Sequence, residues 1–332
     1  MKQQSANCRL FALFSSLMFS VYGHAQEQTA VSLYWAGVRQ TQATNYAAAV
    51  SNYTQAIQMF TQEHDESNRT NARAYSNRGF VRDKLGDHSG ALIDVDEAIR
   101  LDPTSSPIYY NRGSMRFSQN DCAGALADFN QAVNLDPKFI PALATRGIVE
   151  RTMNDLAAAA VNFRKLAELQ STNAIAYAGL AYVQSDQRQW TEALTNFQKA
   201  LQLDPSFTDF PFQIWLIRMR LGDTNTATRE LLDLAKSHAD IQRDRKFGEV
   251  LLSFLTGDVP ETEFLRQAKT LEGDTDSQTR HLSAANYYVG MKHLLAGDRT
   301  VAAEYFQKCL AIGDKHQINY PSARAELNAL KP

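Results

Sequence analysis

The chain has 332 residues, of which 44% are hydrophobic and 21% are charged. This composition supplies enough apolar material for a packed core and excludes a largely disordered chain. A formal net charge of −2 excludes the strongly basic surface that attracts nucleic acid or anionic lipid, so we expect no nucleic-acid partner.

The first 25 residues have the pattern of a secretory signal peptide. Lys2 and Arg9 precede the apolar run LFALFSSLMFSVY (10–22), and the small residues Gly23 and Ala25 follow it. A run of this length is too short to span a hydrocarbon layer of about 30 Å. A buried N-terminal helix is the alternative, but it does not explain the charged start and the small residues. We therefore expect cleavage after Ala25 and export of the chain to the periplasm.

The cysteines predict neither a lipid anchor nor a disulfide framework. Cys8 lies ahead of the apolar run, whereas a lipid-attachment cysteine lies at the cleavage point, so membrane attachment is not predicted. Cys122 and Cys309 are distant in the chain and have no cysteine neighbours. Two separately buried thiols are expected, with a single bridge as the alternative.

A pattern of small and aromatic residues recurs every 34 residues in four consecutive copies, 72–105, 106–139, 140–173 and 174–207. The aligned small residues are Gly79, Gly113, Gly147 and Ala181. Alanines follow twelve residues later, at Ala91, Ala125, Ala159 and Ala193. A further copy lies near 30–63 and another near the C-terminus. Copies in strict phase indicate a true repeat.

This pattern resembles the tetratricopeptide repeat, a unit of two antiparallel helices. The resemblance implies an all-α fold, in which 26–207 form an α-solenoid of stacked helix-turn-helix units. A glycine on each first helix lets the second helix approach closely. The LDP sequences end second helices because proline lacks a backbone donor. Ser106 is expected to cap the helix that follows, with Pro107 in its first turn.

An arginine precedes three of the aligned glycines. Sixteen residues after these arginines stand Asp or Asn, giving the pairs Arg78 with Asp94, Arg112 with Asp128, and Arg146 with Asn162. Antiparallel helices would bring each pair together in a charge-assisted hydrogen bond. We interpret the arginines, like the glycines, as structural. A ladder of ligand-binding arginines is the alternative.

The resemblance also implies that one side of the first helices forms a concave, partner-facing surface, called here the inner wall. The residues predicted to bind a partner there are Arg73, Asn77, Phe80, Tyr110, Asn111, Phe117, Ile148 and Tyr182. Lys84, Arg151 and Ile175 share this register. Matching asparagines hold extended peptides in related proteins, and the mixture of aromatic, apolar and basic groups suits a polypeptide segment. Two alternatives remain open: the asparagines are merely solvated, or residues 26–34 or a second copy fill the groove.

The register breaks after residue 207. Trp215 replaces the expected small residue, so 208–271 are predicted to form degenerate helix pairs with different packing. The polar stretch EGDTDSQTR (272–280) is expected to be a hinge within 272–332, which otherwise contains a restored unit and a capping helix from Pro321.

The order of these C-terminal segments resembles the NlpI-type periplasmic proteins. That resemblance implies an adaptor that brings cell-wall hydrolases, synthases or a protease together with other proteins, and a possible homodimer. No nucleophile elbow, zinc-protease, dinucleotide or P-loop motif occurs. His293 and Cys309 are expected to approach each other, but without an orienting third group. We therefore expect no catalysis, metal or cofactor, and interpret the chain as an exported adaptor that binds proteins or peptides in the cell envelope. An assembly scaffold of a pilus or secretion complex is the alternative.

Overall fold

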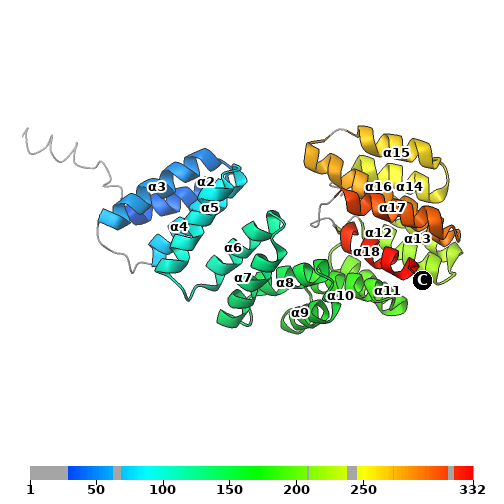
Figure 1. Ribbon diagram of the computed structural model, residues 1–332, viewed down its shortest axis with the longest axis horizontal. Coiled ribbons are helices and arrows are strands. Elements are labelled where there is room, and N and C mark those ends of the chain that lie inside the picture. The colour runs from blue at the N-terminus through cyan, green and yellow to red at the C-terminus, as the bar shows by residue number, and fades with distance from the viewer. Residues whose placement is uncertain are drawn as a thin grey trace, which may run out of the picture. The chain divides into compact units, whose positions relative to one another are not determined.

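The computed structural model describes residues 29–62, 69–207, 209–237, 245–271, 273–312 and 318–331. These residues form α-helices joined by short connections, and no strand occurs among them (Figure 1). The predicted all-α fold is therefore confirmed. The predicted signal peptide lies outside the described residues. The chain divides into two compact units, one up to Met115 and one from Arg116 onward, and each is described by itself.

The first unit is built from antiparallel helix pairs. Its helices are α2 (Ala30–Gln42), α3 (Tyr46–Gln62), α4 (Arg69–Lys84), α5 (His88–Leu101) and most of α6 (Ser106–Ser118). Tyr53 and Phe60, each 1% exposed, fill the core of the first pair. A Cβ atom on Gly37 would lie 2.6 Å from the Tyr53 ring, so the close approach of α2 and α3 requires glycine there.

The second unit continues the helix pairs and then departs from them. Its repeat helices are α7 (Cys122–Leu135), α8 (Ile140–Thr152), α9 (Leu156–Leu169), α10 (Ala174–Asp186) and α11 (Trp190–Leu203). The helices after the register break are α12 (Phe210–Arg220), α13 (Thr224–Ser237), α14 (Arg245–Thr256), α15 (Glu261–Thr270), α16 (Thr275–Leu295), α17 (Arg299–Ala311) and α18 (Asn319–Leu330).

The turn inside each repeat is also periodic. A residue with positive φ precedes the second helix at Gly86, Asn120, Asn154 and Arg188. In the first three repeats the residue that directly follows is an aspartate. The side chain of this aspartate, Asp87, Asp121 or Asp155, accepts a hydrogen bond of 2.9–3.0 Å from the backbone N–H three residues later. Such a carboxylate satisfies a donor that the helix itself leaves free, so the aspartates fix where the second helices begin.

The aligned glycines are packed as the repeat pattern requires. A Cβ on Gly79 would lie 2.8 Å from the carbonyl oxygen of Ala91, and one on Gly147 would lie 2.9 Å from the Phe163 ring. Gly113 is buried on α6. In a close-packed interior no larger side chain fits such a contact without moving its neighbours.

Two expectations about helix boundaries are wrong. Ser106 does not cap α6 but lies inside it, and its buried hydroxyl has no hydrogen-bond partner among the described residues. The polar stretch predicted as a hinge is largely helical, because α16 begins at Thr275. Asp274 caps this helix by accepting a hydrogen bond of 2.8 Å from the N–H of Ser277. The polar residues form the exposed first turns of a long helix.

Trp215 marks the start of a different core. Its indole is 4% exposed and packs in a cluster that includes Phe254, Phe264, Tyr288 and Phe306. An indole cannot take a glycine's place between two close helices, so α12 packs Trp215 toward the later helices, while Ile214 and Ile217 pack against α10 and α11. The predicted capping helix is present as α18, which begins at Asn319, two residues before Pro321.

Candidate binding site

In the first unit, the predicted asparagines are bonded to side chains of neighbouring helices. The amide of Asn77 donates to the Tyr34 hydroxyl at 3.4 Å, and that of Asn111 donates to the Ser76 hydroxyl at 2.8 Å. Phe80 is 38% exposed, and the Lys84 ammonium lies 5.5 Å from the centre of its ring.

The other inner-wall residues near this part of the chain differ in exposure. Arg73 is exposed, whereas Tyr110 and Phe117 are half-buried. Since no partner is present, partner binding by these residues stays a prediction.

The arginines contact the second helices. Arg78 donates to both carboxylate oxygens of Asp94, at 2.7 and 2.8 Å, and Asp94 is only 2% exposed. Arg146 donates to the Asn162 side-chain oxygen at 2.5 and 3.1 Å. These two bonds tie the first helix of a repeat to its second helix.

Arg112 and Asp128 belong to different units, and their pairing stays a prediction. Within the first unit, Arg112 donates to Asp96 at 2.7 Å. Within the second unit, Asp128 accepts from Arg116 at 2.8 Å. Asp128 is 3% exposed, so its pairing with Arg116 satisfies a buried charge.

Tyr182 is largely buried, and partner binding by it stays a prediction. It is 4% exposed, its ring packs edge-on against Phe197 with 4.9 Å between centres, and its hydroxyl donates to Asp209 at 2.6 Å. Arg151 is also buried: it donates to both oxygens of Asp186, at 2.6 and 3.2 Å, and its guanidinium lies 4.8 Å from the centre of the Tyr182 ring. The repeat register places both residues on the inner wall, but α11 and α12 pack against Tyr182 and a later helix contacts Arg151.

The covering helix is α18. Arg324 donates to the carbonyl oxygens of Thr152 and Arg151, at 2.6 and 3.0 Å, where α8 ends and leaves carbonyls without helical partners. Arg151 in turn donates to the Ser322 hydroxyl at 2.7 Å. The C-terminal helix of the same chain therefore covers part of α8 and the end of α10. Filling of the groove by residues 26–34 or by a second copy stays a prediction.

Salt bridges fix the C-terminal part of α18 to neighbouring helices. Glu326, buried on α18, forms a salt bridge with Arg188 at 3.1 Å and another with Arg220. The Arg220 guanidinium also lies 4.4 Å from the centre of the Trp190 ring. These contacts connect α18 to the turn after α10, to the start of α11 and to α12.

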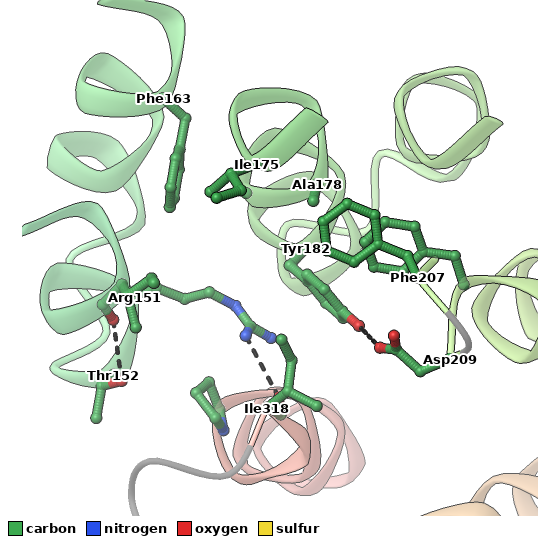
Figure 2. A pocket seen from close by; sticks show the side chains of 13 residues that line it. Arg151, Thr152, Phe163, Ile175, Ala178, Tyr182, Phe207, Asp209 and Ile318 are labelled. Atoms are coloured by element: carbon green, nitrogen blue, oxygen red, sulfur yellow. Dashed lines mark hydrogen bonds between the residues drawn. The ribbon is translucent and has the colours of Figure 1, made fainter. Parts of the chain in front are cut away.

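Beside α18 the surface opens into a pocket of about 320 Å³ (Figure 2). Ile148 of α8 and Ile175 of α10 line it and remain 43% and 47% exposed. The other lining residues are Arg151, Thr152, Phe163, Ala178, Gly179, Tyr182, Phe207, Asp209, Phe210, Ile318 and Pro321. Inner-wall residues and residues after 207 therefore share one pocket.

Asp209 is the one carboxylate that lines this pocket. It stands at the N-cap of α12, where an aspartate normally accepts from the first backbone N–H groups, but its side chain makes no such bond. Pro211 at the second helical position has no N–H to offer. The carboxylate points instead toward Tyr182 (Figure 2). Burial raises the pKa of Asp209, and burial together with Asp209 raises the pKa of Tyr182 well above its usual value.

Sequence reasoning missed Asp209, Phe207 and Ile318. The segment DFP (209–211) carries a usable signal, because an N-cap aspartate followed two residues later by proline has lost a usual hydrogen-bond donor. Nothing in the local sequence of Ile318 indicates that it meets α8, since the two segments are far apart in the chain.

The thiol and imidazole expected to approach each other have separate partners. His293 bonds to Glu261 at 2.8 Å, whereas the buried Cys309 lies 3.4 Å from the Ser283 hydroxyl. Burial raises the pKa of Cys309 to about 11, so the thiol stays protonated at neutral pH. Cys122 is half-buried, and neither it nor Cys309 is part of a disulfide.

The described part of the chain contains neither a helix able to span a membrane nor a cluster of metal ligands. None of its helices combines the length and the apolar character that crossing a bilayer requires. It contains no group of three or more His, Cys, Asp and Glu side chains arranged as metal ligands.

Models of the tetratricopeptide repeat family match residues 106–139 and 145–206. The chain contains tetratricopeptide repeats. The solved structure of PilW, described as a widely conserved type IV pilus biogenesis factor, is similar to it at 18% identity with a TM-score of 0.55, over 65% of this chain and 96% of PilW. Pseudomonas aeruginosa PilF is similar at 15% identity and a TM-score of 0.55, over 69% of this chain and 97% of PilF.

A tetratricopeptide repeat protein from Parabacteroides merdae is similar over more of the chain. At 17% identity and a TM-score of 0.54, the match covers 91% of this chain and 99% of that one. At such identities the likeness concerns the fold alone. Since it covers so much of the chain, it includes helices beyond the tetratricopeptide repeats that the family models match.

Proposed function

We propose that this protein is an exported adaptor that binds segments of other proteins in the bacterial cell envelope, and that the pocket beside α18 holds such a segment. The observation that carries the proposal is this open, mainly apolar pocket on the inner face of tetratricopeptide repeats. Stacked repeats present extended surfaces that are used for binding proteins. The family therefore supports a protein ligand rather than a metabolite.

The walls of the pocket suit an anchoring side chain. Ile148 and Ile175 come from successive first helices and stay nearly half exposed, although burying either would be favourable. Phe163 and Phe207 add ring surface next to them. A pocket of about 320 Å³ is large enough for one bulky side chain with part of its backbone, the kind of concave site that dominates binding energy.

Export and envelope function rest on the sequence. The signal-peptide pattern of residues 1–25 supports export, and the order of segments in 208–332 supports an NlpI-type adaptor of cell-wall enzymes or a protease. A scaffold for pilus or secretion-complex assembly is the competing proposal. An adaptor should capture several unrelated proteins in cross-linked periplasm, whereas an assembly scaffold should co-purify with one large complex. Light scattering after size exclusion tests the proposed homodimer.

The pocket is tested by placing a photo-cross-linking residue at Ile175 and, separately, by changing Ile148 to Lys. An ammonium in the apolar wall should weaken client capture by about tenfold or more, because an apolar anchoring group would have to desolvate it and a basic one would be repelled by it. Val161→Lys is the matched control, since Val161 is 59% exposed on α9 and does not line the pocket. Equal capture by the two variants, or no cross-link from position 175, would rule out the pocket as the binding site.

A further inference from the structure

We infer that the pocket accepts a basic side chain, lysine or arginine, of the bound segment, with its aliphatic stem against Ile148, Ile175 and Phe207 and its charged end at Asp209. This inference rests on the proposed function, because it names the chemistry that the same pocket would recognise. It goes further by assigning a role to Asp209, which the repeat architecture does not need.

The first step is the charge of the pocket lining. Arg151 is its only basic residue, and both oxygens of Asp186 already accept from this guanidinium. Ser322 and the carbonyl oxygen of Ile318 take further bonds from it. The positive charge is thus compensated, and Asp209 is left as a carboxylate with no basic partner among the described residues. Charge complementarity then favours a cation as the missing group.

The second step is the groups that face Asp209 from the surrounding helices. From α10 comes the Tyr182 hydroxyl, which donates to one carboxylate oxygen at 2.6 Å. From α16 comes Tyr288, whose hydroxyl accepts a hydrogen bond of 3.1 Å from Gln213 of α12 and whose pKa the nearby Asp209 helps to raise. Both are neutral, so they solvate the carboxylate but do not balance its charge.

The third step is the free-energy cost of taking the Asp209 carboxylate out of water. A carboxylate removed from water without a cation is unfavourable, which agrees with the raised pKa of Asp209. Asp209 also forgoes the stabilising N-cap bond to α12. A bound ammonium or guanidinium would replace the lost water and restore the charged carboxylate.

The apolar walls exclude the simpler ligands. A leucine or phenylalanine side chain would match the isoleucines but would leave the carboxylate buried against hydrocarbon. An acidic side chain would place two like charges together. Lysine and arginine match both features, because their long stems pack on apolar surface while their ends stay polar.

The test uses the full mature chain with ¹³C-labelled isoleucine methyl groups, since Ile148, Ile175 and Ile318 all line the pocket. The probes are three capped pentapeptides, Ala-Ala-X-Ala-Ala, with lysine, norleucine or glutamate at X. The lysine peptide should shift the three methyl resonances and bind about tenfold more tightly than the norleucine peptide, which has the same stem without the charge. Asp209→Asn should abolish that preference and leave norleucine binding unchanged, with an unchanged far-UV circular dichroism spectrum as the control for folding.

The outcomes separate the two proposals. Equal or tighter binding of norleucine at the three methyl groups would overturn the inference and leave the pocket as an apolar docking site. A lysine preference that persists in Asp209→Asn would also overturn it. If no peptide shifts the three resonances, the inference fails, while cross-linking from position 175 to protein clients independently decides the proposed function.

Discussion

Gly179→Ala should destabilise the second unit through the Phe163 ring. A Cβ at position 179 would lie 2.3 Å from two atoms of this ring, a separation about 1 Å shorter than an ordinary carbon contact. The ring cannot swing away freely, because Gly147 of α8 lies on it closely as well and Phe163 is only 1% exposed. Overpacking of this kind costs about 3 kcal/mol at the upper end of its usual range.

The helix propensity of alanine offsets part of this cost. Alanine in place of glycine favours the α10 helix by about 1 kcal/mol, so the free energy of unfolding should fall by about 2 kcal/mol. For a unit of this size that corresponds to a melting temperature lower by about 4–8 °C, measurable by circular dichroism.

A double-mutant cycle tests the cause. In a Phe163→Leu background the same Gly179→Ala change should cost much less, because the flat ring edge that it meets is gone. If Gly179→Ala were as stable as the unchanged protein, or if its cost were equal in both backgrounds, the packing of Phe163 between the two glycines would not be what limits residue 179 to glycine.

Two predictions concern ionisable groups. Burial raises the pKa of Asp209 in the folded protein above its value in the unfolded chain. At a pH between these two pKa values the folded protein keeps a proton that the unfolded chain has lost. The free energy of unfolding should therefore decrease as pH rises through this window. Urea unfolding at several pH values should show Asp209→Asn gaining stability relative to the unchanged protein as pH increases, and a constant difference would contradict the raised pKa. Cys309, with a pKa of about 11, should resist a thiol reagent at neutral pH until the protein is unfolded, whereas the half-buried Cys122 should react in the native state. Rapid native modification of Cys309 would contradict its burial, and Cys309→Ser identifies the signal.

The sequence predicts the repeats well because their determinants are local. Gly79 and Ala91, for instance, belong to one helix pair and are only twelve residues apart, and a Cβ on Gly79 would lie 2.8 Å from the Ala91 carbonyl oxygen. Arg78 and Asp94 are similarly close in sequence, so antiparallel pairing alone decides their contact. Such features follow from helix period and turn length.

The candidate site is less predictable because it depends on contacts between distant residues. Arg151 and Ser322 are 171 residues apart in the sequence, and no periodic signal links them. The repeat register places Arg151 and Tyr182 on the inner wall, but it cannot show that Arg151 bonds to α18 or that Tyr182 bonds to Asp209. Nor does the sequence reveal that Ile318 and Pro321 line the same pocket as Ile148 and Ile175.

The position of α18 also has a consequence for biosynthesis. Ile318 and Pro321 follow the repeat helices in the chain, so the pocket lacks one wall until these two residues have been synthesised. Helix pairs before them depend on neighbours that are already synthesised and can form earlier. A chain terminated before α18 would therefore carry folded repeats while its inner face lacks Arg324 and Glu326. Binding at the pocket would begin only after α18 has been added.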